Sequence, residues 1–318
     1  MPSAVSRVLR SRVLPLAAAA LAAAALIGCA VPQTDALLAA TREQPRPPVL
    51  LQAVPFFPQQ DYACGPASLA MAMGAAGRNV TPEALVADVF VPGRQGSLQA
   101  EMLAAPRRYG LLATQLPPRL AAVLAEVSAG TPVVVMQNLG LSWLPVWHYA
   151  VVVGHDLEAG QIVLHSGATQ RLRMPLAVFE RTWGRAERWA IAVTPPARIP
   201  VTATESAAVA AAIGLERASP QAALTAYEAI LQRWPASRLA LFGRGNARLA
   251  MGEYPLAVVA FREAVAAHPD FADAWNNLAV VLLETGDRPQ ARVAAERAVS
   301  IGGPRSAQYR ETLARVGR

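Results

Sequence analysis

The segment PFFPQQDYACGPASLAM, residues 55–71, says more about fold and chemistry than any other stretch of the chain. Cys64 stands directly before a run of small and apolar residues, and Gly65 and Pro66 suit a tight turn into a helix. The N-terminus of a helix carries partial positive charge, which lowers the pKa of a thiol and favours the nucleophilic thiolate. The segment therefore predicts a reactive cysteine at the start of a helix.

A thiol nucleophile needs a base that lies close to it in space. The chain has four histidines. His148 opens the apolar run HYAVVVG, where a polar first residue needs an explanation. A histidine at a strand edge, bonded to a carbonyl, is the structural alternative. His268 precedes Pro269 in a helical region and is set aside.

These two motifs resemble the papain-like cysteine peptidases that process double-glycine leaders of bacteriocins, and their stand-alone relatives. The resemblance covers about residues 50–195 and rests on Gln-x4-Cys-Gly-Pro-Ala, which starts at Gln59, and on the run that starts at His148. It implies Cys64 as nucleophile, His148 as base and Gln59 as oxyanion donor, together with the Cys64 backbone N–H. Gln60 is the alternative glutamine.

The third member of the family's site is where this chain departs. The family places an aspartate on the strand after the histidine, whereas here residues 163–167 read VLHSG, without a carboxylate. His165 or Ser166 could orient the imidazole through a hydrogen bond, and Asp156 is a candidate in the preceding turn. None of these replaces a buried carboxylate behind His148 directly. A Cys-His dyad, a weak enzyme and a role without catalysis therefore all stay open.

The pattern over residues 50–195 predicts an α+β domain with an antiparallel sheet, because helical stretches come first and apolar strands follow. Thr81 and Pro82 form an expected N-cap and first helical residue. We interpret Trp143, Trp147 and Trp183 as core residues or as the lining of a cleft. The expected helices are residues 65–77, 82–90, 98–109 and 118–129, and the expected strands are 132–137, 148–154, 161–165 and 189–194.

The N-terminus has the pattern of an export signal. Three arginines precede an apolar stretch, residues 13–27, that ends in Leu-Ile-Gly-Cys at Cys29. This ending resembles the bacterial lipobox, which implies that residues 1–28 are a signal peptide and that Cys29 carries the lipid anchor. Ala30 favours the outer membrane over the inner one. The expected location is the bacterial cell envelope, facing the periplasm, with residues 29–49 as a proline-containing tether.

Beyond a proline-rich linker, residues 196–202, the chain repeats with a period of 34 residues. Gly252 and Gly286 are one period apart, as are Pro255 and Pro289. This period is typical of tetratricopeptide repeats. We expect about three repeats over residues 203–316, an all-α domain that binds a protein partner.

Several other classes of function find no support in the sequence. The net charge is +7, but the arginines are scattered without a basic run, so we expect no nucleic-acid partner. With Cys29 lipidated, the two cysteines cannot form a zinc site, and no glycine-rich phosphate loop follows a strand. We therefore expect neither metal nor cofactor.

The sequence as a whole predicts an α+β papain-like cysteine peptidase domain followed by tetratricopeptide repeats. The expected activity is cleavage of a peptide or protein substrate by a Cys-His mechanism, while the repeats recruit a partner or the substrate. One alternative is an inactive scaffold or peptide-binding lipoprotein. Another is acyl transfer on the same fold, as a transpeptidase or an amidase.

Overall fold

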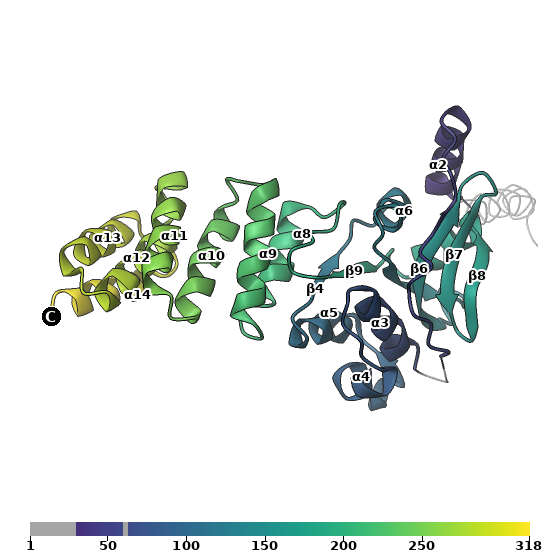
Figure 1. Cartoon of the computed structure of the whole chain (residues 1–318), viewed down its shortest axis with the longest axis horizontal. Helices are drawn as coiled ribbons and strands as arrows, with labels where there is room; N and C mark the ends of the chain where they lie inside the picture. Colours follow the sequence, from purple (N-terminus) through teal and green to yellow (C-terminus); the bar gives the residue numbers. More distant parts are fainter. Residues whose placement is uncertain (1–29, 60–62) are drawn as a thin grey trace, which may run out of the picture.

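The computed structural model describes residues 30–59 and 63–318. A sheet domain comes first, and a row of paired helices extends from it to the C-terminus at the far end (Figure 1). The expected signal peptide, residues 1–28, the expected lipidated Cys29 and the alternative glutamine Gln60 lie outside the described residues.

The sheet has seven strands, and every neighbouring pair is antiparallel, as predicted. Six strands follow the order β4-β9-β5-β6-β7-β8, and β1 pairs with the far end of β6. The bounds are β1 Val49–Leu50, β4 Leu112–Gln115, β5 Val133–Asn138, β6 Trp147–Asp156, β7 Gln161–Ser166, β8 Thr169–Pro175 and β9 Ala190–Thr194. The sequence had not indicated β8, because five of its seven residues are exposed and its apolar alternation is limited to Leu172 and Met174.

Helices cover both faces of this sheet, with a core on each side. On one face, α3 (Cys64–Ala75), α4 (Pro82–Val89) and α5 (Gln99–Arg108) pack against residues such as Val151 and Val153. On the other, α6 (Leu120–Ser128) and α7 (Leu176–Gly184) pack against Ala150 and Val152. The alternation along β6 thus supplies both cores. A short 3-10 helix, η1 (Pro92–Arg94), joins β2 (Phe90–Val91) to β3 (Gly96–Ser97) beside α3.

The segment interpreted as a tether, residues 29–49, is largely ordered against the domain. It contains helix α2 (Pro32–Glu43), whose residues Leu37 and Leu38 pack on the core beneath α6 and α7. The interpretation as a free tether is therefore wrong for residues 32–43, since buried contacts fix them. Among the described residues, no helix combines the length and the apolar character needed to cross a membrane.

The C-terminal region forms three helix pairs and a final helix. The pairs are α8 (Glu205–Ile213) with α9 (Pro220–Arg233), α10 (Arg238–Ala250) with α11 (Tyr254–Ala267), and α12 (Ala272–Glu284) with α13 (Arg288–Ile301); α14 (Ser306–Val316) closes the array. Gly252 and Gly286, one period apart, both adopt a left-handed φ in the turns between paired helices, which glycine tolerates best. Their repeat in the sequence thus has a backbone cause.

The first repeat packs directly on the sheet domain. Leu112 of β4 shares a core with Ala208 of α8 and Tyr227 of α9. In the expected linker, Thr202 donates its N–H to the buried Glu126 of α6 at 2.6 Å, and Arg233 donates to the Pro200 carbonyl at 3.0 Å. The linker is therefore part of an interface that fixes the repeats against the sheet.

Close packing between repeat helices predicts the cost of two small substitutions. A Cβ on Gly243 would lie 2.1 Å from the Tyr227 ring, and one on Gly245 would lie 2.5 Å from the Phe261 ring. We expect Gly243→Ala and Gly245→Ala each to destabilise the protein by about 1–3 kcal/mol through overpacking. Thermal unfolding followed by circular dichroism measures this. Gly184→Ala, whose Cβ meets nothing within 4 Å, is the control and should not lower the melting temperature. Equal melting temperatures for all three variants would contradict the packing argument.

Candidate active site

Cys64 is the first residue of α3 and is partly buried at the sheet. All residues from Gly65 to Met73 are buried, so the start of this helix is held firmly by the core. A Cβ on Gly65 would lie 2.2 Å from Ser97 Oγ. Glycine after the cysteine thus allows the β2–β3 hairpin to pack closely against the start of the helix.

The surroundings of the thiol act on its pKa in opposite directions. The backbone N–H groups of Tyr149, Gly65 and Cys64 lower it, but burial has the larger effect and raises the pKa of Cys64 above its ordinary value of 9.0. The prediction that the helix start would favour the thiolate is therefore wrong for the resting protein. The influence of the Tyr149 N–H also places the thiol beside the backbone of β6, at the residue that follows His148 in the chain.

His148 lies near the start of β6 and is tied to the neighbouring strand. Its Nε2 lies 2.9 Å from Ser166 Oγ at the end of β7. Burial lowers the pKa of His148 below its ordinary 6.5, so the imidazole is neutral at pH 7. No hydrogen bond joins Cys64 to His148 within the described part of the chain, which is common before substrate binds. With Nε2 engaged, Nδ1 is the nitrogen left to accept a proton.

The other two candidates for a third member lie elsewhere. His165 is buried, accepts from the Arg171 N–H and contacts the Val54 carbonyl, with Phe56 edge-on to its ring. Asp156 accepts from Ala159 in the β6–β7 turn. Of the three residues, only Ser166 bonds to His148.

Gln59 reaches the site but uses its amide to join three elements. Its side-chain NH₂ donates to Ser68 Oγ of α3 at 3.1 Å and to the Tyr149 carbonyl of β6 at 3.3 Å. Its Oε1 accepts from the Gly167 N–H at 3.0 Å, in the turn that follows Ser166. Because both amide hydrogens are engaged, this geometry supports a positioning role for Gln59 rather than the expected oxyanion role. No local pattern around Gln59 indicates these bonds, because their partners are distant along the chain.

The three tryptophans assigned to the core or a cleft have different fates. Trp183 is fully buried and donates to the Trp189 carbonyl, as expected for a core residue. Trp143, in the loop between β5 and β6, and Trp147, the first residue of β6, are instead 78% and 53% exposed. Their exposure contradicts a place in the core and leaves the lining of a cleft as the interpretation.

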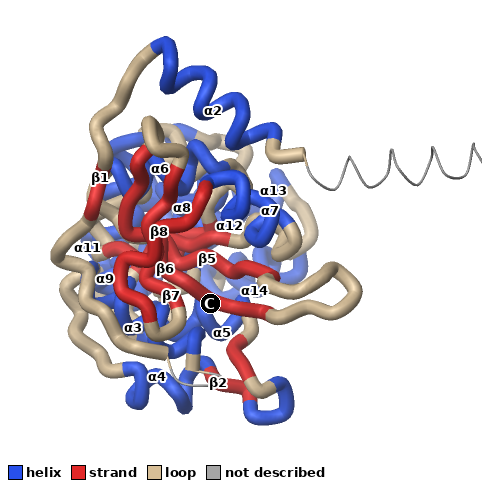
Figure 2. The backbone as a smooth tube through the Cα atoms, turned by 90° about the vertical axis from the view of Figure 1, so that its right-hand side faces the viewer, coloured by secondary structure: helices blue, strands red, loops and turns tan. Residues whose placement is uncertain are grey.

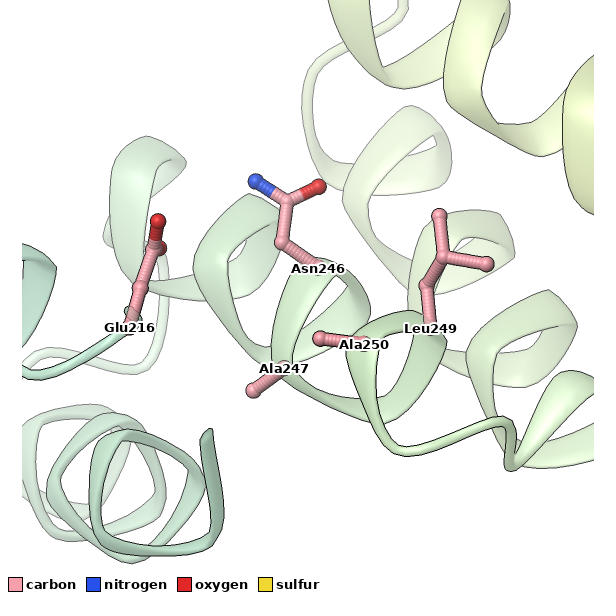
Figure 3. Close-up of a pocket in the computed structure, with 5 residues that line it drawn as sticks. All are labelled: Glu216, Asn246, Ala247, Leu249 and Ala250. Atoms are coloured by element: carbon pink, nitrogen blue, oxygen red, sulfur yellow. The ribbon is translucent and has the colours of Figure 1, made fainter. Parts of the chain in front are cut away.

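Two pockets of the repeats are lined by residues of α8, of the loop after it and of α10. One, of about 290 Å³, is lined by Glu216, Asn246, Ala247, Leu249 and Ala250. In Figure 3 the carboxylate of Glu216 and the amide of Asn246 point the same way. The other, of about 530 Å³, includes the apolar side chains of Val209, Ile213 and Leu239. Both linings are mixed, because the smaller pocket also has three apolar residues and the larger one also has Thr204, Glu205, Ser206 and Arg238. Among the described residues, no group of three His, Cys, Asp or Glu side chains could hold a metal ion.

Comparison with known families agrees with this division of the chain. Residues 51–191 match the Peptidase_C39 like family, and residues 211–258 and 243–307 match the tetratricopeptide repeat. The chain carries a C39-like peptidase domain and tetratricopeptide repeats. The predicted fold class, an α+β papain-like domain followed by all-α repeats, is thereby confirmed.

Among solved structures, similarity is distant for each part. A C39-like peptidase from Bacillus anthracis is 19% identical over 47% of this chain and 98% of its own, with a TM-score of 0.40. The Yersinia enterocolitica type III secretion translocator chaperone SycD is 18% identical over 35% of this chain and 81% of its own, with a TM-score of 0.33. The TPR2B domain of yeast Sti1, in complex with pHsp70, is 15% identical over 36% and 95%, with a TM-score of 0.34. No curated protein matches the sequence.

The raised pKa of Cys64 predicts how its alkylation depends on pH. Because burial raises the pKa above 9.0, the rate of iodoacetamide addition should still be rising at pH 9. Mass spectrometry of the peptide that contains Cys64 follows this rate, with glutathione as the reference thiol. The midpoint of the pH profile, unlike the absolute rate, does not depend on access to the thiol. A rate that reaches its plateau below pH 9 would contradict the burial argument.

Proposed function

We propose that this protein is a cysteine peptidase that hydrolyses peptide bonds with Cys64 as nucleophile and His148 as base. One observation carries the proposal: the thiol at the start of α3 lies beside the backbone of Tyr149, and the residue before Tyr149 is His148, whose ring is hydrogen-bonded to Ser166. The C39-like family of the domain supports the same chemistry.

The resting state is a neutral pair, because the pKa of Cys64 is raised and that of His148 is lowered. Sγ of Cys64 attacks the carbonyl carbon as its proton passes to Nδ1 of His148. The oxyanion faces N–H groups of the first helical turn, which have no intrahelical acceptors. The C–N bond then breaks, and His148 gives its proton to the leaving amine. Water, deprotonated by His148, hydrolyses the thioester and restores the thiol.

The repeats recruit a protein partner or the substrate itself. Tetratricopeptide repeats typically bind protein segments, and the space between α8 and α10 suits an extended peptide. Val209, Ile213 and Leu239 of the larger pocket would take an apolar residue, with Glu205 and Arg238 at the same pocket to hold polar groups of the peptide. The amide of Asn246 and the carboxylate of Glu216 would take a polar or basic one. Because the first repeat packs on β4, a captured peptide is held at a fixed position relative to the sheet domain.

We also propose that the protein is lipid-anchored through Cys29 in the bacterial cell envelope. The lipobox-like ending of the N-terminal apolar stretch supports this, and Ala30 favours the outer membrane. The domain then faces the periplasm, and substrates are peptides or proteins of that compartment.

Two other functions compete with hydrolysis. Acyl transfer would use the same thioester, with an amine in place of water as the acceptor. A scaffold without catalysis is favoured by the lack of a carboxylate on His148, since Ser166 stabilises an imidazolium less than aspartate does.

The central prediction is that Cys64→Ala abolishes cleavage. Purified protein is incubated with a mixed peptide library, and the products are identified by mass spectrometry. We expect new termini with the wild type and none with Cys64→Ala, while Cys29→Ala, assayed in detergent, keeps the activity because Cys29 plays no part in the chemistry. Amide products with an added amine would indicate transfer instead. Identical product sets for wild type and Cys64→Ala would rule the peptidase out.

The Ser166 contact predicts a gain of function. Ser166→Asp places a carboxylate beside His148, which raises the pKa of the imidazole and stabilises the imidazolium formed during attack. We expect kcat/KM to rise about tenfold, or about 1.4 kcal/mol, and the acid limb of the pH profile to move upward. Ser166→Ala removes one hydrogen bond, worth about 1 kcal/mol, and should lower kcat/KM about fivefold. Unchanged pH profiles in both variants would show that Ser166 does not act on the base.

A further inference from the structure

The loop between β5 and β6 presents an unusual concentration of exposed apolar side chains. Residues 139–147 read LGLSWLPVW, and we call this segment the apolar hairpin. Its tip residue Trp143 is 78% exposed, and the other large apolar side chains are exposed as well: Leu139, Leu141, Leu144, Val146 and Trp147. The segment contains no charged residue. Soluble monomers rarely carry a continuous exposed apolar surface of this kind, which marks an interaction site.

Hydrogen bonds hold the apolar hairpin in one conformation. Oδ1 of the buried Asn138 accepts from the N–H groups of Gly140 at 3.0 Å and Val146 at 2.9 Å. Its Nδ2 donates to the Leu141 carbonyl at 3.2 Å. Leu141 and Leu144 then form a bridge across the tip. The apolar side chains are thus presented by a braced β-hairpin, so little ordering entropy is lost when they bind.

The base of the apolar hairpin and the start of helix α2 are both held by α7. Arg185, which caps the end of α7, donates to the Asn138 carbonyl at 2.9 and 3.2 Å. Glu180 of the same helix accepts from the N–H groups of Gln33 at 3.1 Å and Thr34 at 2.7 Å. Five residues of helix span about 8 Å. Figure 2 shows the β5–β6 loop and the start of α2 reaching out on the same side of the molecule.

The start of α2 leaves little freedom to the residues before it. Gln33 also accepts from the Leu120 N–H at 2.6 Å, so three hydrogen bonds fix this point on the domain. Three residues lie between Cys29 and Gln33, so the four Cα–Cα steps span at most about 14 Å when fully extended. Whatever surface holds Cys29 is therefore kept close to the side from which the apolar hairpin projects.

We propose that the apolar hairpin inserts into the interfacial layer of a lipid bilayer. A bilayer suits a projecting, uncharged tip that carries a tryptophan among leucines, since tryptophan favours the membrane–water interface. The short connection to Cys29 places that bilayer within reach. This orientation rests on the proposed lipid anchor, but not on the proposed peptidase activity. Because Trp147 directly precedes His148, the candidate active site then works on segments presented close to the membrane surface.

Depth-dependent quenching of tryptophan fluorescence tests the inference on the full chain. The protein is reconstituted into vesicles of phosphatidylethanolamine and phosphatidylglycerol, with or without phosphatidylcholine that carries brominated acyl chains. Trp143→Phe keeps the apolar surface but removes the fluorophore at the tip. We expect brominated lipid to quench the wild type, and to quench Trp143→Phe clearly less. Trp275→Phe, in the repeats, is the matched control and should keep the quenching of the wild type.

A second variant separates insertion from other uses of the surface. The double variant Leu141→Ser and Leu144→Ser should at least halve the quenched fraction, whereas Leu256→Ser, an exposed leucine in the repeats that lines neither pocket, should leave it unchanged. Absence of vesicle binding by the full chain, or equal quenching of wild type and Trp143→Phe, overturns the proposal. Unchanged quenching with a raised KM for peptide cleavage in the double variant overturns it in favour of a substrate-binding role. Loss of peptidase activity alone, as in Cys64→Ala, should not affect quenching.

Discussion

The packing of α3 against β6 is the constraint on which the candidate site depends. Helix α3 has no charged residue, and every residue from Gly65 to Met73 is buried, so the helix can lie only in the core. That burial brings Cys64 to the backbone of β6 at Tyr149, the residue that follows His148 in the chain. The same burial raises the pKa of the thiol, because a thiolate loses solvation there. The packing of α3 thus has two effects. It brings the thiol of Cys64 to β6, and it keeps that thiol protonated in the resting protein.

Sequence patterns predicted those parts of the fold that depend on local apolar periodicity and on turn chemistry. Thr81 accepts the Ala84 N–H as an N-cap, and His148 heads a buried strand, because both features follow from neighbouring residues. Strand β8 escaped prediction because it lies at the sheet edge with polar side chains, so its place depends on pairing with β7 rather than on burial. Helix α2 escaped it because its docking depends on the distant Glu180.

In the candidate site, too, features that depend on local sequence could be predicted and features that depend on tertiary contacts could not. Cys64 and His148 could be found from motifs, since each stands at the start of a recognisable element. The pKa of the thiol could not, because the helix effect is local and visible in sequence whereas burial depends on the whole fold. The hydrogen bonds of Gln59 could not be predicted either, because the three groups that bond to its side chain lie 9, 90 and 108 residues away along the chain. The motifs therefore identified the candidate residues, whereas the pKa of Cys64 and the hydrogen bonds of Gln59 depend on the packing of the whole domain.

A neutral thiol–imidazole pair with a serine behind the histidine places a particular demand on the substrate. Because Cys64 and His148 do not form an ion pair in the resting protein, the thiol proton must pass to the imidazole while the S–C bond forms. The rate then depends strongly on how well the substrate and the two side chains are positioned. The structure provides rigidity for this in three places: Gln59 ties α3 to β6, the first repeat shares a core with β4, and Asn138 braces the strand end before His148. A site of low intrinsic reactivity, fixed to a recognition array, makes binding rather than the thiol the source of selectivity. In such an arrangement, peptides that reach Cys64 without binding to the repeats are not cleaved efficiently.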